Sequence, residues 1–377
     1  MESYKAVVIG AGTAGLSAAR VLDNHHVDYL LIDSKKEIGK PIRSTGGVAL
    51  NFVRKLGMPD SPSVIARYIQ SIRLAGDNDD DVVLNFDHPV GVTYDFTKYE
   101  QSLARGLNIR MGVQVTGVHG MWDPVFGKQG RATVDTSDGS IQADFVIIAT
   151  GPNSALAPRD MKINRSDMLV AYEETRVIKN PSKYDLTIWF SKYAEGGYVW
   201  DFGDTGNKRR IGLGFPVTNG WNIKSQLEKF TAEHPDIAGD VDHVIAHQIP
   251  VGKPPEGVTS QHVAWAGDVV NTCQADTGGG LQTAFWSGRE AGMSVVRGDL
   301  SWYQHRWNAE IRPHLLRHYK IKRAMYRIGT SNLPTLFPVM RSFNVHSEDA
   351  SRELPRLLWH VVKNKPSLLL RMIPSLI

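Results

Sequence analysis

Cysteine is almost absent from this chain: among 377 residues only Cys273 carries a thiol. A disulfide framework and a cysteine-based zinc site are therefore excluded. Long apolar runs are also missing, and the C-terminal SLLLRMIPSLI is interrupted by Arg371 and Pro374, so no segment is expected to span a bilayer. We expect no signal peptide, because a strand-like run begins by Tyr4. These absences predict a cytoplasmic protein that can touch a membrane surface but not cross it.

The charge is unevenly distributed along the chain. The net charge is only +4, yet residues 301–377 hold 13 Lys and Arg against four Asp and Glu. Basic helices with aromatic and aliphatic residues can rest on an anionic lipid surface. The same composition is also typical of a helical cap whose basic outer faces are solvated, so the membrane-contact and solvated-cap interpretations both stay open. We expect no nucleic-acid partner.

The clearest motif is AVVIGAGTAGLSAARVLDNHHVDYLLIDS at residues 6–34. An apolar strand runs into Gly10, Gly12 and Gly15, then a helix and a second strand follow. The glycines permit a tight turn, close approach of a pyrophosphate, and close packing of helix on sheet. Asp33, at the end of the second strand, can accept hydrogen bonds from ribose hydroxyls. This pattern predicts a dinucleotide site but serves NAD and FAD alike.

A second glycine-rich segment distinguishes the two nucleotides. HVAWAGDVVNTCQADTGGGLQTAFWSGREAG at residues 262–292 joins a strand to Asp268, and then to three glycines that open a helix. A carboxylate there can hold a ribityl hydroxyl, and the helix start can stabilise negative charge on a reduced flavin. Between the two segments, residues 139–156 form an apolar strand that ends at Thr150-Gly151. The combination predicts FAD.

Together these segments resemble the geranylgeranyl reductase family of FAD-dependent prenyl reductases, within the p-hydroxybenzoate hydroxylase-like fold. The resemblance covers roughly residues 4–300 and includes DSKKEIGKPIRSTGGVAL (33–50), the aromatic GGYVWDFG (196–203) and AHQIPVG (246–252). Ser44 stands where family members usually carry a cysteine. The resemblance implies that FAD is held by Gly10, Gly12, Thr13, Ala14, Gly15, Asp33, Arg43, Ser44, Thr45, Gly47, Val115, Thr150, Gly151, Asp268, Gly279, Gly280 and Leu281.

The pattern of residues 160–255, in the middle of the chain, predicts alternating strands with one helix near 222–233 and a hairpin turn at 204–208. The two-residue period of a strand places three aromatic residues on one face: Tyr198, Trp200 and Phe202. A row of aromatic side chains on one face of a strand commonly belongs to the hydrophobic core. The family resemblance favours a substrate pocket instead.

The fold class we predict is α/β with α+β mixing: a Rossmann-type FAD-binding domain, an antiparallel-sheet substrate domain and a helical C-terminal region. Residues 1–155 with 256–300 would form the first, 156–255 the second and 301–377 the third.

The resemblance implies an enzyme that reduces isolated double bonds of geranylgeranyl chains on a lipid or on geranylgeranyl diphosphate. Its electrons would come from NAD(P)H or a ferredoxin-like protein. Flavin monooxygenases and halogenases share the fold, and a non-catalytic flavin scaffold or redox sensor is a third reading. No catalytic side chain or metal site can be assigned. Disulfide reductases are disfavoured, since they need a redox pair of cysteines and a second dinucleotide fingerprint.

Overall fold

The computed structural model describes residues 1–78, 80–120, 131–152, 154–158, 161, 164–341, 360 and 363. The chain divides into two compact units, each assembled from three separate stretches. Unit 1 comprises Met1–Ile42, Phe96–Asn164 and Ile249–Arg317. Unit 2 comprises Arg43–Asp95, Arg165–Gln248 and His318–Ile377. The three-part domain division expected from the sequence stays a prediction.

Unit 1 contains a mixed sheet, which has seven strands among the described residues. Its strands are β8 (Ile109–Met111), β2 (Tyr29–Asp33), β1 (Glu2–Ile9), β11 (Gly139–Ile148), β10 (Ala132–Thr136), β9 (Val115–His119) and, paired with β11, β17 (Val263–Trp265). Strand β1 runs parallel to both β2 and β11, and β17 runs parallel to β11. The buried parts of β1, β2 and β17 are continuous apolar runs, because parallel strands are covered on both faces of the sheet. The predicted Rossmann-type core is confirmed.

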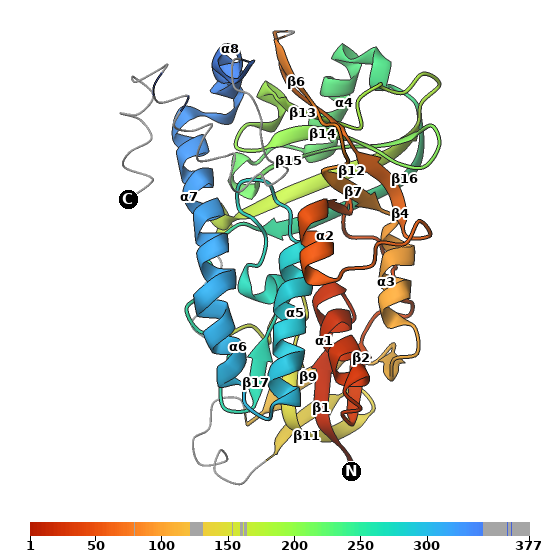
Figure 1. Cartoon of the computed structure of the whole chain (residues 1–377), viewed down its shortest axis with the longest axis vertical. Helices are drawn as coiled ribbons and strands as arrows, with labels where there is room; N and C mark the ends of the chain where they lie inside the picture. Colours follow the sequence, from red (N-terminus) through yellow and green to blue (C-terminus); the bar gives the residue numbers. More distant parts are fainter. Residues whose placement is uncertain are drawn as a thin grey trace. The chain divides into compact units, whose positions relative to one another are not determined.

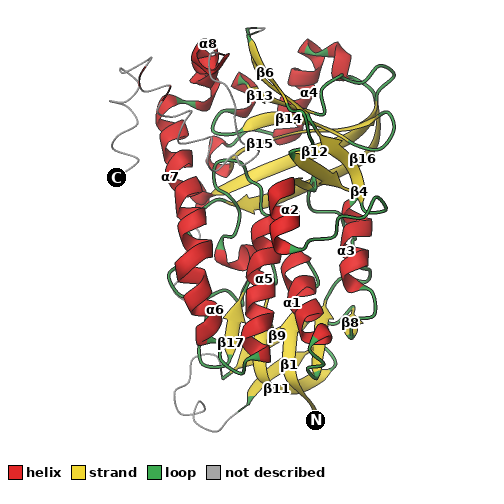
Figure 2. Ribbon diagram, in the orientation of Figure 1, coloured by secondary structure: helices red, strands yellow, loops and turns green. Residues whose placement is uncertain are grey.

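Two glycine-flanked helices pack side by side in unit 1. Helix α1 (Thr13–Asn24) follows the first glycine turn, and α5 (Leu281–Val296) follows the second. Figures 1 and 2 show α5 lying beside α1, although the two helices are far apart in the sequence. The approach requires a missing side chain, because a Cβ atom on Gly288 would lie 2.0 Å from the Ala14 carbonyl oxygen. Unit 1 also contains α3 (Phe96–Ala104) and α6 (Ser301–Arg306).

Unit 2 is built on a second sheet, whose central strands are antiparallel as predicted. In spatial order its strands are β16 (Asp240–Pro250), β12 (Met168–Val177), β15 (Lys208–Pro216), β14 (Tyr198–Gly203), β13 (Leu186–Phe190), β5 (Ser71–Gly76) and β6 (Asp81–Asn85). The predicted turn joins β14 to β15, with a hydrogen bond of 3.0 Å from Asp204 N to Lys208 O. A smaller sheet contains β3 (Gly47–Ala49), β7 (Gly91–Tyr94) and β4 (Ile65–Ile69), next to α2 (Leu50–Leu56).

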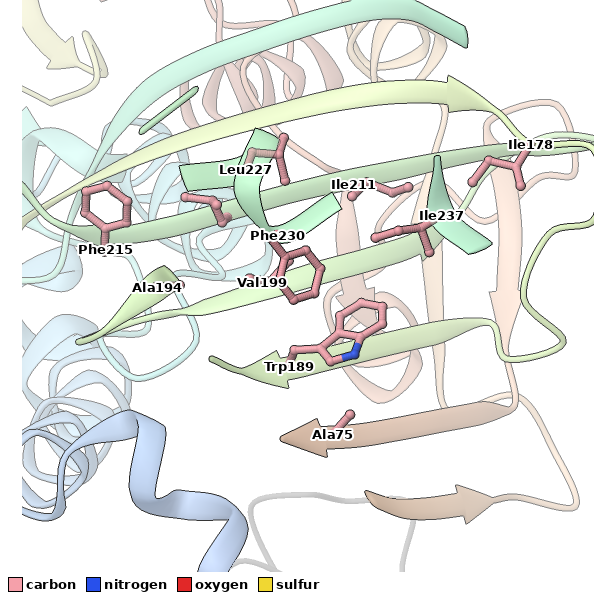
Figure 3. Close-up of a cluster of buried hydrophobic side chains, with 11 residues drawn as sticks. Ala75, Ile178, Trp189, Ala194, Val199, Ile211, Phe215, Leu227, Phe230 and Ile237 are labelled. Atoms are coloured by element: carbon pink, nitrogen blue, oxygen red, sulfur yellow. The ribbon is translucent and has the colours of Figure 1, made fainter. Parts of the chain in front are cut away.

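The side chains on one face of the large sheet of unit 2 form part of its hydrophobic core. Helix α4 (Ile223–Glu233), close to the predicted helix, covers this face and begins where the Asn222 side chain accepts from Ser225 N at 3.0 Å. Figure 3 shows Phe230 of α4 among Val199 and Trp189 of the sheet. The rings of Trp189 and Phe230 meet edge to face with centroids 5.4 Å apart. Side chains alternate between the two faces of a strand, and Val199 faces α4. Its neighbours on β14, including the three predicted aromatic residues, therefore face the other side of the sheet.

The C-terminal part of the chain is helical as far as it is described. A π-helical turn at Trp307–Ile311 leads into α7 (Arg312–Ile328), and α8 (Phe337–Arg341) follows a 3-10 segment. The predicted helical character of residues 301–377 is therefore confirmed as far as Arg341, whereas all later residues except His360 and Lys363 lie outside the described part of the chain. In the part of the chain that the structure describes, no helix combines the length and apolarity needed to cross a membrane.

Candidate active site

The first glycine turn has the geometry that the sequence predicts. Gly10 adopts a φ of +104°, and a Cβ there would lie 2.4 Å from the Ala149 carbonyl oxygen. A Cβ on Gly15 would lie 1.8 Å from the Gly10 oxygen. The protein itself therefore requires both glycines. Gly12 is different, because the nearest atom to its added Cβ is a Glu100 oxygen 4.0 Å away. The open approach at Gly12 is what a bound pyrophosphate needs.

The start of α1 leaves donors for an anion. Its N-cap residue, Gly12, has no side chain to accept from the first-turn amides. The Thr13 hydroxyl oxygen is fully buried and has no hydrogen-bond partner among the described residues. Buried polar groups normally have partners, and a phosphate oxygen at a helix N-terminus would provide one here. The turn thus fits the pyrophosphate of FAD.

Asp33 organises the same turn from the end of β2. Its carboxylate accepts from Ala11 N at 2.5 Å and from Lys35 N at 2.7 Å. The Lys35 ammonium donates to Ala11 O at 2.9 Å and lies 3.7 Å from a Glu100 carboxylate oxygen. Burial raises the pKa of Glu100 to about 6, although Lys35 opposes the shift. The ribose contact of Asp33 stays a prediction.

The second glycine segment surrounds the Asp268 carboxylate. One of its oxygens accepts from the Thr272 hydroxyl at 3.0 Å and from the Cys273 thiol at 3.3 Å. Burial raises the pKa of Asp268 and raises that of the Cys273 thiol well above its usual range, so the thiol stays a protonated donor. A Cβ on Gly280 would lie 2.8 Å from the Cys273 sulfur. Helix α5 then begins at Leu281, without a side-chain cap.

The two glycine segments meet in unit 1. A Cβ on Gly267, which precedes Asp268, would lie 2.8 Å from the Ala14 Cβ. The predicted cofactor residues found in this unit are Gly10, Gly12, Thr13, Ala14, Gly15, Asp33, Val115, Thr150, Gly151, Asp268, Gly279, Gly280 and Leu281. Val115 begins β9, and β10 separates that strand from β11. Its contact with FAD, like the others, stays a prediction.

The remaining predicted site residues lie in unit 2. Two of them, Thr45 and Trp200, contact Glu173, which the sequence analysis missed. The Thr45 hydroxyl donates to Glu173 Oε2 at 2.5 Å, and the Trp200 indole N–H donates to the same oxygen at 2.7 Å. The segment after β2 and the aromatic strand are thus joined by one carboxyl group. Of the neighbouring predicted residues, Arg43 is exposed, and the Ser44 hydroxyl accepts from Gly46 N at 3.0 Å.

The aromatic stripe lies on the sheet face opposite the α4 core. Tyr198 and Trp200 meet nearly edge to face, with ring centroids 5.8 Å apart. Phe202 covers Gly47, where an added Cβ would lie 2.8 Å from the Phe202 ring. None of the three belongs to the buried cluster around Trp189. The predicted shared face is confirmed, while substrate contact stays a prediction.

Comparison with known proteins supports the resemblance that the motifs indicate. The pyridine nucleotide-disulphide oxidoreductase family matches residues 4–160. Among curated proteins, the digeranylgeranylglycerophospholipid reductase of Methanocella arvoryzae is 25% identical over 98% of both chains. The reductase of the same name from Methanothrix thermoacetophila is 26% identical, covering 94% of this chain and 97% of its own.

Solved structures share the fold at lower identity. A geranylgeranyl bacteriochlorophyll reductase-like protein from Thermoplasma acidophilum superposes with a TM-score of 0.88 at 20% identity, with complete coverage of both chains. HpxO from Klebsiella pneumoniae, solved in complex with FAD, gives a TM-score of 0.70 at 18% identity over 95% of this chain and 98% of its own. The predicted fold, the FAD cofactor and the resemblance are confirmed: the chain is an FAD-dependent oxidoreductase related to the geranylgeranyl reductases.

Proposed function

We propose that this protein hydrogenates isolated double bonds in the prenyl chains of a lipid, most directly a digeranylgeranyl glycerophospholipid. The observation that carries the proposal is the aromatic face of the sheet in unit 2, which meets the Thr45 segment at Glu173. The two reductases compared above are named for this lipid. FAD, when bound and reduced, supplies hydride.

The residues of this chain would act mainly by positioning the substrate. An isolated alkene has no carbonyl group to absorb charge, so the double bond must be aligned with the hydride donor and kept from water. Trp200 is held at its ring nitrogen by Glu173 and is only 7% exposed, so its ring is fixed. A fixed aromatic surface can hold an apolar chain in one orientation.

The test is mass spectrometry of the lipid after incubation with the dithionite-reduced, FAD-loaded protein. Each saturated bond adds two hydrogens to the lipid mass. Trp200→Ala should retain FAD but lose rate by about 100-fold, the cost of roughly 1 Å of misplacement. Trp221→Ala removes an indole that is 40% exposed and should leave the rate unchanged. If no lipid gains hydrogens while NADPH drives oxygen consumption with an apolar substrate, the protein is a monooxygenase.

The same assay identifies the electron source. NADPH, NADH and a reduced ferredoxin can each replace dithionite, and the donor that sustains repeated turnover is the physiological class. We propose an external donor that delivers two electrons per double bond.

We also propose that α7 rests on an anionic membrane surface. Its exposed residues include four cations at helical spacing: Arg317, Lys320, Arg323 and Arg327. The opposite side of the helix is occupied, since Ala324 and Ile328 pack against Leu333. Each basic residue near an anionic surface contributes about 1 kcal/mol.

Liposome flotation tests this membrane proposal. The protein should float with anionic vesicles and not with neutral ones, and replacing the four cations with Gln should abolish the difference. Lys224→Gln with Lys229→Gln on α4 is the control for lost charge, because both of these residues are also exposed. Equal recovery with both kinds of vesicle would remove the membrane claim.

A further inference from the structure

Glu173 lies in a row that crosses three strands of unit 2. It pairs with Gly212 of β15, and Gly212 pairs with Trp200 of β14. The three residues share one face of the sheet, and the middle one has no side chain. Consequently the Trp200 indole extends over Gly212 and reaches the carboxyl group of Glu173.

The two oxygens of Glu173 have different surroundings. Oε2 accepts both hydrogen bonds, from Thr45 and from Trp200. Oε1 has no hydrogen-bond partner among the described residues, and it is not one of the fully enclosed unpartnered atoms. The 4% of the residue that stays exposed therefore includes Oε1. One oxygen is fixed by the protein, and the other is free for a ligand.

No cation forms an ion pair with Glu173 in the described part of the chain. The charged groups that shift its pKa are Arg210 and Asp204. Arg210 pairs with Asp204 at 2.9 Å and also donates to the Tyr94 carbonyl oxygen at 2.9 Å. Burial raises the pKa of Glu173, although Arg210 and the hydrogen bonds from Thr45 and Trp200 each act to lower it. In the neutral acid, the oxygen that accepts two hydrogen bonds is the carbonyl oxygen, so the proton sits on Oε1.

We propose that Glu173 is the proton donor of the hydrogenation. This inference rests on the proposed function, since the hydride comes from the reduced cofactor. The Oε1–H bond and the π bond of the alkene break. One alkene carbon gains the proton and the other gains the hydride with its two electrons. Glu173 is left as a carboxylate, held by Thr45 and Trp200 until it regains a proton from water.

The test compares Glu173→Gln with Glu174→Gln. The amide keeps an acceptor for Thr45 and Trp200 but has no acidic proton. Glu174 is a matched control, because it is on the same strand and is also buried, but it bonds to Arg176 and Tyr172 instead. General acid catalysis contributes about 10²–10⁴-fold to a rate. Glu173→Gln should therefore lower single-turnover hydrogenation by at least about 100-fold, with FAD content unchanged, and Glu174→Gln should not.

A second measurement does not depend on activity. At neutral pH the infrared carbonyl band of a protonated carboxylic acid should be present in wild type and lost in Glu173→Gln. If this band is unchanged in the variant, Glu173 is ionised and the proposal is wrong. If wild type hydrogenates the lipid and Glu173→Gln does so at a similar rate, only the assignment of Glu173 as the proton donor is wrong. If wild type saturates no prenyl lipid, the proposed function fails with it.

The conservative variant Glu173→Asp provides a test if the Glu173→Gln protein does not fold. Aspartate keeps an acid but retracts it by one methylene group, so both the infrared band and the rate should change. An unchanged band and rate would overturn the proposal.

Discussion

Gly212 offers the sharpest test of the geometry around Trp200. A Cβ added to Gly212 would lie 2.5 Å from Cζ2 of Trp200 and 2.6 Å from the Tyr172 carbonyl oxygen. One contact is with a ring that can rotate away only by losing its hydrogen bond to Glu173. The other is with backbone, which can move only if the paired strands separate. Gly212→Ala therefore cannot be accommodated without loss.

The expected cost follows from these contacts. Overpacking a filled site costs about 1–3 kcal/mol, and losing the indole hydrogen bond costs about 1 kcal/mol more. Alanine recovers about 0.5–1 kcal/mol relative to glycine in a strand interior. The net destabilisation should be roughly 1–3 kcal/mol. Gly214→Ala is the matched control, because its added Cβ would meet no atom closer than 3.4 Å. That variant should be neutral or slightly stabilised.

Urea unfolding of the FAD-bound variants, followed by tryptophan fluorescence, measures the difference. Trp200→Phe shortens the ring and should relieve part of the Gly212→Ala penalty but not all of it, because the Tyr172 oxygen remains. A double-mutant cycle reports this coupling. If Gly212→Ala and Gly214→Ala unfold at the same urea concentration, the indole does not lie over Gly212 and the proposed role of Glu173 loses its basis.

Three further outcomes can be checked. Asp268→Ala should lower the flavin content of the purified protein, measured as the ratio of flavin to protein absorbance; unchanged occupancy would contradict the cofactor assignment. The pKa of Glu100 is raised from 4.5 to about 6, so between these values the native apoprotein binds a proton that the unfolded chain has lost. Stability should therefore fall by about 1.5 kcal/mol as pH rises from 4.5 to 6.5, and urea midpoints for Glu100→Gln should lack this slope. Arg209→Met should cost about 3–5 kcal/mol of unfolding free energy, because the fully buried Asp201 side chain loses its ion pair. Adding Asp201→Asn should restore much of this free energy, and a failure to do so would mean that the unpaired Asp201 carboxylate is not the cause of the loss.

Local signals in the sequence predicted the parts of the fold that depend on local geometry. The turn at Gly10 needs a positive φ, and the strand before it needs a continuous apolar run, so both can be recognised in a short window. The alternation that places Tyr198, Trp200 and Phe202 on one face is likewise local. The cofactor and the enzyme class followed from these patterns combined with the family resemblance.

Glu173 could not be predicted in the same way. The sequence places Glu173 and Glu174 side by side, and only the strand parity separates their two faces. Which residue meets Trp200 depends on the pairing of β12 with β15 and of β15 with β14, a register that no local pattern encodes. Lys35 and Glu100 were missed for the same reason, because their contact joins distant segments. The alternating glycines at 212 and 214 were the one available signal, since they leave room for a large neighbouring side chain.

The interleaving of the two units has a consequence for how the chain folds. The sheet of unit 1 gains β17 only at Val263–Trp265, and α1 gains its partner α5 only when Leu281–Val296 has been synthesised. Contacts between such distant segments close slowly, because the entropy of the intervening loop must be lost first. On the ribosome, the apolar side of α1 near Gly15 therefore stays uncovered until α5 has been synthesised. Exposed surface of this kind is what chaperones bind and what aggregates when they are absent. The position of α5 in the sequence thus determines how late in synthesis the nucleotide fold can close.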